Sequence, residues 1–261
     1  MVDDASTDET GDVAARAGAR VIRHTENRGA AAARNTGMAA TAQSWIAPLD
    51  SDDRWLPHML DTLWPFRNGY AFVAGASMAV DGEDVPVAYG GALDPEPVVL
   101  SSPGALIFPE NFVAASGVIV RREALVKVHG YRDFQRSAED FDLWVRLLSE
   151  QSGLSVPRVV TLYSVHAGQK GRQSGRPALD IVTRYHDQPW YTPALAEQRQ
   201  AVVAWDEMRA ALAARRMREA TARARWLVAT RLRREAIRVT LARRREGRQR
   251  AARWEHENPR A

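Results

Sequence analysis

Residues 45–53 read WIAPLDSDD, an apolar run that ends in three carboxylates within four residues. A strand that delivers carboxylates at its carboxyl end places them where open α/β sheets bind their ligands. Crowded carboxylates repel one another, and a bound cation or a hydrogen-bond network relieves that cost. The stretch therefore favours a hard divalent ion at this edge of a sheet. Capping of a following helix by Asp52 or Asp53 is a second interpretation of the same residues.

The rest of the pattern also predicts an α/β fold, because strand-like and helix-like segments alternate along the chain. Strands are expected at residues 20–24, 45–49, 70–88, 112–120 and 156–165. Helices are expected at residues 30–42, 57–63, 122–128 and 139–150. Residues 90–109 are rich in Pro, Gly and Ser, which predicts a mobile loop between these elements.

The composition is that of a globular protein, with 45% hydrophobic residues among 261. The chain has no cysteine, which excludes disulfides and thiolate metal sites. No apolar run approaches the length of a membrane span. Residues 199–261 hold 18 Arg and 7 acidic residues, a net charge of +11, so the preceding residues carry about −7 against +4 for the whole chain. The chain therefore divides into an acidic body and a basic tail.

Three further stretches accompany the carboxylate cluster. They read VDDASTDET at residues 2–10, NRG at 27–29 with ARNTG at 33–37, and AEDFDLWVRL at 138–147. In this order and at these spacings, residues 1–174 resemble family 2 glycosyltransferases, inverting enzymes with the glycosyltransferase-A fold. The resemblance implies an open mixed sheet flanked by helices, of the nucleotide-diphospho-sugar transferase type.

The resemblance implies a site for a nucleotide-sugar donor, most simply a UDP-sugar. Asp4 corresponds to the family's reader of the nucleotide base, and Arg34 lies in the block that holds the nucleotide. Asp50 and Asp52 match the two ends of the Asp-x-Asp motif. By that match, Asp52 coordinates Mn²⁺ or Mg²⁺ bound to the donor diphosphate, and Asp50 contacts the ribose or a metal-bound water. Asp53 is expected to precede the next helix rather than to bind metal.

The acceptor side is expected at the start of the helix predicted at residues 139–150. The family's Glu-Asp pair corresponds to Glu139 and Asp140, with Asp140 as the general base and Glu139 as its support. Favourable charge at a helix N-terminus is the structural alternative for both residues. His166 corresponds to a family histidine that serves as a further metal ligand or contacts the diphosphate, although the arginine that usually precedes it is absent here. Lys170 and Arg172 lie in a loop that would close over the diphosphate or remain solvated.

Two domains are expected, a catalytic domain at residues 1–188 and an Arg/Ala-rich helical extension at residues 189–261. In the family, a strand and a helix precede the first block, so the chain is expected to be N-terminally truncated. The basic extension fits helices that pack on the body or a partner, a helix on an anionic membrane surface, or a solvated appendage. No recognition motif supports nucleic-acid binding.

The predicted function is therefore metal-dependent, inverting sugar transfer to a hydroxyl of a glycan, glycolipid or protein acceptor. The expected location is cytoplasmic, either free or peripheral at the inner membrane face. The alternative from another class is a catalytically inactive fragment that associates with proteins or membranes through its basic tail. Nucleotidyl transfer also uses clustered carboxylates, but it leaves the Glu139-Asp140 block unexplained.

Overall fold

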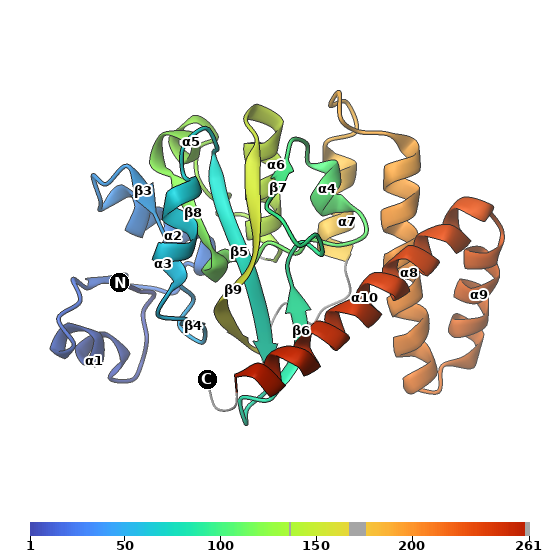
Figure 1. Cartoon of the computed structure of the whole chain (residues 1–261), viewed down its shortest axis with the longest axis horizontal. Coiled ribbons are helices and arrows are strands. Elements are labelled where there is room, and N and C mark those ends of the chain that lie inside the picture. The colour runs from blue at the N-terminus through green and yellow to red at the C-terminus, as the bar shows by residue number, and fades with distance from the viewer. Residues whose placement is uncertain (136, 167–175, 259–261) are drawn as a thin grey trace.

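A mixed β-sheet forms the centre of the molecule in the computed structural model, which describes residues 1–135, 137–166 and 176–258 (Figure 1). Within these residues the sheet has seven strands in the order β3-β8-β5-β9-β4, with β6 paired to β5 and β7 paired to β9. The strands are β3 (Trp45–Ile46), β4 (Arg54–Trp55), β5 (Phe72–Val80), β6 (Pro86–Gly90), β7 (Val98–Leu100), β8 (Val118–Arg121) and β9 (Gly153–Ser164). The predicted α/β class with an open mixed sheet is confirmed.

The strands β5 and β9 pair in parallel in the interior of this sheet. Their register runs from Val73 opposite Leu154 to Val80 opposite Ser164. The other pairings of the sheet in the described residues are antiparallel. Gly75 lies opposite Val156 of β9, next to a shift in the register. A Cβ there would be 2.3 Å from Cγ2 of Val160, so only glycine fits without displacing the valine.

Helices cover both faces of the sheet, because successive side chains of a strand point to opposite sides. Phe72 and Ala74 pack under α6 on one face, whereas Val73 packs with α3 on the other. The helices before the tail are α1 (Thr10–Arg16), α2 (Ala30–Ala39), α3 (Met59–Leu63), α4 (Gly104–Ile107), α5 (Arg122–Lys127), α6 (Glu139–Glu150) and α7 (Arg176–Arg184), and the 3-10 turns are η1 (Trp64–Phe66) and η2 (Ala115–Gly117). The predicted helix at residues 139–150 is confirmed, and its Trp144 packs fully buried at 5.3 Å from the Phe72 ring.

The N-terminal segment forms a small unit beside the main sheet. Its strands β1 (Val2–Asp3) and β2 (Ile22–Arg23) pair in parallel with each other and form a separate two-stranded sheet in the described residues. Figure 1 shows this unit and α1 at one side of the molecule. The α2 helix leads from it toward the main sheet.

Residues 90–109 differ from the predicted mobile loop. The segment contains β7, which pairs with β9, and the short helix α4. Leu100, Leu106 and Ile107 are fully buried in the core beside α6. The apolar residues of the segment therefore anchor it, although its Pro, Gly and Ser content is typical of a loop.

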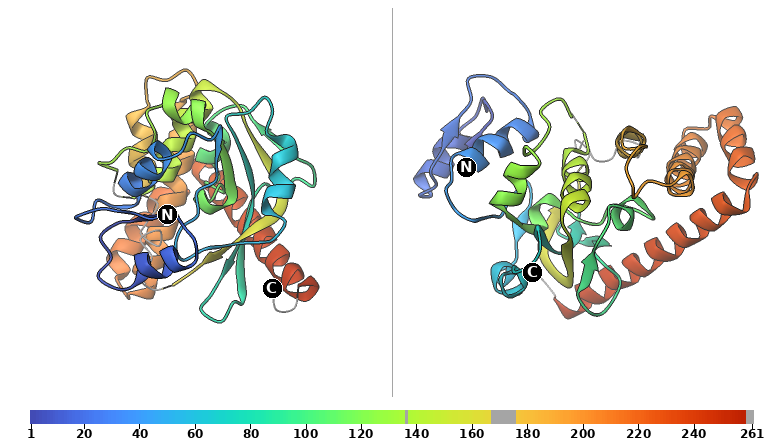
Figure 2. Two further views of the ribbon diagram at one scale, coloured as in Figure 1. Left: turned by 90° about the vertical axis from the view of Figure 1, so that its left-hand side faces the viewer. Right: turned by 90° about the horizontal axis from the view of Figure 1, so that it is seen from above.

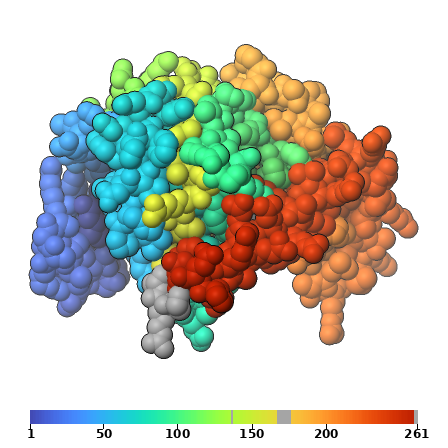
Figure 3. Space-filling model, in the orientation of Figure 1, coloured from blue at the N-terminus to red at the C-terminus, as the bar shows by residue number. Residues whose placement is uncertain are grey.

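The basic tail folds into three helices, α8 (Pro193–Ala213), α9 (Met217–Val228) and α10 (Arg231–Glu257). Figures 1 and 2 show α8 and α9 beside the body, while α10 runs back across it along β6. Ala251 is buried in a cluster with Met78 and Val80 of the sheet. The space-filling view shows α10 seated on the body along much of its length (Figure 3). The tail is therefore packed on the body and does not extend freely into solvent.

None of the helices in the described part of the chain is long and apolar enough to cross a membrane.

Candidate active site

A cavity of about 580 Å³ lies between α2, the start of α6, the segment before β8, and the helices α7 and α8. This volume is within the range of small-molecule sites. We call it the central cavity. It is lined by Arg34, Asp50, Glu139 and Asp140 from the predicted site, and also by Tyr163 and Arg199. The structure therefore brings together four of the seven predicted site residues, which lie up to 106 positions apart in the sequence.

Arg34 on α2 connects two of these carboxylates. Its Nη2 donates to Oδ1 of Asp50 at 2.6 Å, and its Nη1 donates to Oε1 of Glu139 at 2.8 Å. The side chain is only 14% exposed, and its guanidinium lies 5.3 Å from the centre of the Tyr131 ring. Burial by itself would lower the pKa of Arg34, but Asp50 and Glu139 raise it on balance. Arg34 is therefore a permanent cation between the two carboxylates.

Asp140 has the electrostatics of a general base. Burial and the charge of Glu139 together raise its pKa to about 6, although the charge of Arg34 lowers it. Its Oδ1 accepts a hydrogen bond from the backbone N–H of Phe141 at 2.7 Å. A carboxylate with this pKa is ionised at neutral pH and binds a proton more strongly than an ordinary aspartate.

The backbone before α6 is strained at the residue that sets the direction of Glu139 and Asp140. Ala138 is the N-cap and has φ 58° and ψ 32°, the left-handed region that costs an alanine about 1 kcal/mol. Its methyl group offers no side-chain cap to the helix. Such strain is often retained where the position of functional side chains requires it.

Asp52 and His166 meet at the rim of the carboxylate cluster. Nε2 of His166 is 3.1 Å from Oδ2 of Asp52, and the two side chains are 52% and 41% exposed. The structure therefore brings these two predicted metal ligands together. No group of three or more His, Asp or Glu side chains suited to a metal occurs among residues 1–135, 137–166 and 176–258.

Asp53 has a structural place that differs from the predicted helix start. Its Oδ2 accepts from the Ser116 hydroxyl at 2.5 Å, and its Oδ1 accepts from the backbone N–H of Ser164 at 3.1 Å. Burial raises the pKa of Asp53 to about 6 in spite of these hydrogen bonds. The next helix, α3, begins at Met59 after the N-cap His58. Asp53 thus joins the carboxylate segment to β9 and to the turn before β8.

Asp4 lies behind the cavity wall. Its carboxylate accepts hydrogen bonds from the backbone N–H groups of Arg28 at 3.0 Å and Gly29 at 2.7 Å, and from His24 Nδ1 at 2.6 Å. Desolvation raises the pKa of Asp4, but these hydrogen bonds lower it below its usual value. Gly29 has φ +91°, a conformation that favours glycine, and this presents both N–H groups to Asp4. Arg28 and Gly29 line the cavity, whereas Asp4 supports them from behind.

Sequence reasoning missed Tyr131, Tyr163 and Arg199. Burial raises the pKa of Tyr163 to about 12, so it is a neutral hydroxyl in the cavity. Tyr131 lies in none of the recognised motifs, and Tyr163 lies in the motif of His166 but has no role of its own in the prediction. Arg199 could not be told apart from the other arginines of the tail. The predicted loop residues Lys170 and Arg172 lie outside the described residues.

Residues 1–125 match the family model for Glycosyl transferase family 2. The succinoglycan biosynthesis protein ExoU of Rhizobium meliloti (strain 1021) is 32% identical over 167 residues, which cover 57% of this chain and 48% of ExoU. The UDP-Glc:alpha-D-GlcNAc-diphosphoundecaprenol beta-1,3-glucosyltransferase WfaP of Escherichia coli is 30% identical over 185 residues, which cover 64% of this chain and 65% of WfaP.

Among solved structures, S. aureus TarS 1-349 in complex with UDP-GlcNAc has a TM-score of 0.55 and 19% identity, with 77% of this chain and 60% of that chain covered. This likeness shows the fold. Residues 1–125 therefore have the sequence of glycosyltransferase family 2, and the chain has the mixed α/β fold with helices on both faces that its sequence predicts. It spans about half the length of ExoU.

Proposed function

We propose that this chain transfers a sugar from a nucleotide-diphosphate donor to an acceptor hydroxyl, with inversion at the anomeric carbon. The observation that carries the proposal is the central cavity, where Asp140 with a pKa of about 6 lies near the Arg34–Asp50 pair. Family membership supports the class of reaction. A UDP-sugar donor is supported by the name of WfaP and by the UDP-GlcNAc complex of TarS.

The proposed reaction is a single displacement with Asp140 as the base. Its carboxylate takes the proton of the acceptor hydroxyl while that oxygen attacks the anomeric carbon. The bond from this carbon to the donor diphosphate breaks, and its electron pair leaves with the nucleoside diphosphate. Attack from the face opposite the leaving group inverts the configuration. Arg34 orients Asp50 and Glu139 throughout, through the hydrogen bonds it donates to each.

The side chains at the rim fit a divalent cation shared with the donor. Mg²⁺ in nucleotide sites is usually held by one or two carboxylates together with substrate phosphates, rather than by an all-protein cage. Asp52 and His166, 3.1 Å apart and open to solvent, would supply such a partial set for Mn²⁺ or Mg²⁺. The bound ion would act as a Lewis acid that neutralises charge on the departing diphosphate.

The acceptor is proposed to be a hydroxyl of a saccharide. The name of ExoU refers to a polysaccharide, and the name of WfaP specifies a saccharide linked to a lipid through a diphosphate. These names support a role in polysaccharide or lipid-linked glycan assembly. We propose that Asp4 contributes to binding of the nucleotide base indirectly, because it holds the Arg28–Gly29 backbone that lines the cavity.

The first test is UDP binding by calorimetry with and without Mn²⁺. We expect binding that requires the metal and that Asp52→Ala abolishes. Asp61→Ala, an exposed aspartate on α3, is the matched control and should bind as the wild type does. Absence of UDP binding by wild-type protein that circular dichroism shows to be folded would overturn the proposal and favour the non-catalytic alternative.

A further inference from the structure

Arg199 on α8 is a buried cation that has no hydrogen-bond or ion-pair partner among the described residues. The residue is 8% exposed, and its Nε is buried without a hydrogen bond. Within residues 1–135, 137–166 and 176–258, neither a hydrogen bond nor an ion pair is formed by its guanidinium. Arg199 nevertheless lines the central cavity. A charged group in this state is costly, since burial has removed most of its water and no carboxylate of the described residues pairs with it directly.

The acidic residues near Arg199 are already engaged by other arginines. Glu110 accepts from Arg243 Nε at 3.2 Å, and Asp206 accepts from both Nη atoms of Arg244 at 2.7 and 2.8 Å. Burial lowers the pKa of Arg199, Glu110 and Asp206 oppose this, and Arg244 adds to it. The local arrangement therefore has one positive charge in excess, at the cavity wall.

The surroundings of Arg199 separate it from the proposed donor side. Arg199 is supplied by α8 of the tail and lies near Glu110, Asp206 and Arg244, whereas the proposed donor side has Arg34 on α2 bound to Asp50. Arg199 thus belongs to the tail side of the cavity, and Arg34 belongs to the body side.

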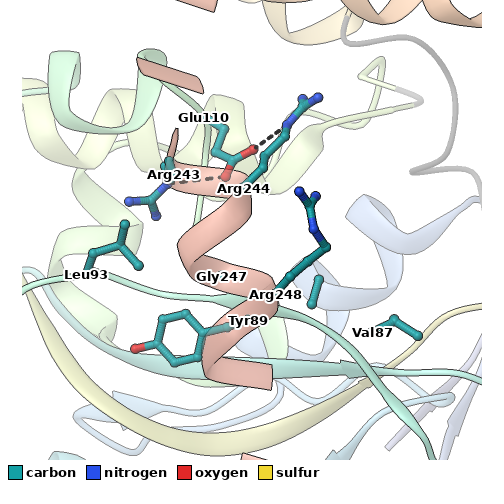
Figure 4. A pocket seen from close by; sticks show the side chains of 9 residues that line it. Val87, Tyr89, Leu93, Glu110, Arg243, Arg244, Gly247 and Arg248 are labelled. Carbon is teal, nitrogen blue, oxygen red and sulfur yellow. Dashed lines mark hydrogen bonds and ion pairs between the residues drawn. The ribbon is translucent and has the colours of Figure 1, made fainter. Parts of the chain in front are cut away.

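The positive wall continues beyond the cavity. An adjoining pocket of about 270 Å³ shares Ala88, Tyr89 and Glu110 with it and is lined on the other side by α10. Figure 4 shows Glu110 between Arg243 and Arg244, with Arg248 further along the helix. Arg199 in the central cavity and these α10 arginines in the adjoining pocket therefore supply positive charge to two connected hollows.

We propose that Arg199 binds an anionic group, a phosphate or a carboxylate, carried by the acceptor saccharide. This inference rests on the proposed function and names the class of its acceptor. The planar guanidinium suits both anions because it donates parallel hydrogen bonds to two oxygens. The tail then has a direct role in acceptor recognition, since α8 delivers the group that completes the cavity.

The test uses ligand-dependent thermal stability, which does not require turnover. Glucose 1-phosphate, glucuronate and neutral glucose are each titrated against the full chain in metal-free buffer at constant ionic strength. We expect one or both anionic sugars to raise the Tm by about 3 °C when saturating, and glucose to leave it unchanged. A response to glucose 1-phosphate alone assigns a phosphate, a response to glucuronate alone assigns a carboxylate, and a response to both assigns a general anion site.

Variants locate the response. Arg199→Met keeps an aliphatic chain of similar length and should lose the shift, while Arg199→Lys should retain a smaller one because it keeps the charge without the planar fork. The control is Arg209→Met, which removes an exposed arginine from the same helix and should respond as the wild type does. Equal Tm values with all three sugars in the wild type, or a shift that survives in Arg199→Met, would overturn the inference.

The donor site is followed separately. Metal-dependent UDP binding should be unchanged in Arg199→Met, and the shift with anionic sugars should persist in Asp52→Ala. Loss of UDP binding in the wild type would refute the proposed function, whereas loss of the sugar response alone would refute the role of Arg199. A shift that disappears in Asp52→Ala would place the anion at the donor site and would also refute that role.

Discussion

Arg34 donates a 2.8 Å hydrogen bond to Glu139 across 105 positions of sequence. The contact joins α2, which follows the N-terminal unit, to the first residue of α6 on the other side of the central cavity. The same guanidinium also holds Asp50 at the end of the carboxylate stretch. The position of the proposed base, one residue after Glu139, therefore depends on a residue of the proposed donor side.

Removal of the Arg34 cation should change both stability and the pH profile. Arg34→Met leaves two carboxylates partly buried without their partner, so we expect the free energy of unfolding to fall by about 3 kcal/mol. The pKa of Asp140 should rise further, because Arg34 lowers it in the wild type. Urea unfolding and the pH dependence of transfer measure the two effects. Arg34→Lys should show smaller changes in both, and an unchanged pH profile in Arg34→Met would contradict the role of Arg34 beside Asp140.

The rate of transfer should depend on the ionisation of Asp140. Because its pKa is about 6, kcat/KM is expected to fall on the acid side of pH 6 and to level off above it. Asp140→Asn removes the base and should lower kcat by about 10²–10⁴-fold, with UDP binding retained. The measurement is the rate of transfer across roughly pH 5–8, the window around the pKa of Asp140. A variant that keeps wild-type kcat would show that another group takes the proton.

The same group should make stability depend on pH. Folding raises the pKa of Asp140 from 3.8 to about 6, so the folded state binds this proton more strongly than the unfolded state does. The resulting stabilisation is complete below pH 3.8 and is lost as the pH rises through about 6. Asn does not titrate, so Asp140→Asn should gain stability relative to the wild type over this window, by roughly 3 kcal/mol at most. The pKa of Asp53 is also raised to about 6, but Asp53 is present in the wild type and in Asp140→Asn, so its effect cancels in the difference between their stabilities. Urea unfolding at several pH values tests this, and a constant difference would refute it.

Asp142 should be essential for the stability of α6. Its fully buried carboxylate accepts from Arg132 Nη1 at 3.1 Å, Arg146 Nε at 2.8 Å and the Tyr185 hydroxyl at 3.1 Å. Asp142→Asn leaves the buried Arg146 and the partly exposed Arg132 without a counter-charge, so we expect a loss of about 3 kcal/mol in urea unfolding. The matched control is Asp180→Asn on the exposed side of α7, with an expected change below about 0.5 kcal/mol. A similar effect of both substitutions would contradict the buried cluster.

His166 should contribute to the metal-dependent part of donor binding. His166→Ala removes the imidazole beside Asp52, so we expect Mn²⁺-dependent UDP affinity to fall about tenfold, or 1.4 kcal/mol by the usual conversion. His186→Ala, at an exposed histidine after α7, serves as the control. Wild-type affinity in His166→Ala would leave Asp52 as the sole proposed protein ligand.

The prediction succeeded best where local pattern and burial agree. The helix at residues 139–150 has its apolar side chains at helical spacing, and the structure forms α6 over the same residues. The segment at residues 90–109 failed because its composition is typical of a loop, while Leu100, Leu106 and Ile107 are buried by distant parts of the chain. The local structural propensity of a segment does not reveal whether distant parts of the chain will bury it.

The amino-acid sequence by itself determined the α/β class, the family and the residue types available for chemistry, because periodicity and motif spacing are local properties of the chain. Tertiary structure alone decided which of these residues meet. It joined Arg34 to Glu139, buried Asp140 enough to raise its pKa, held Asp4 behind the cavity wall and brought Arg199 to the opposite side. Burial and electrostatic coupling arise between segments far apart in sequence, so they exist only once the sheet and the tail helices have packed.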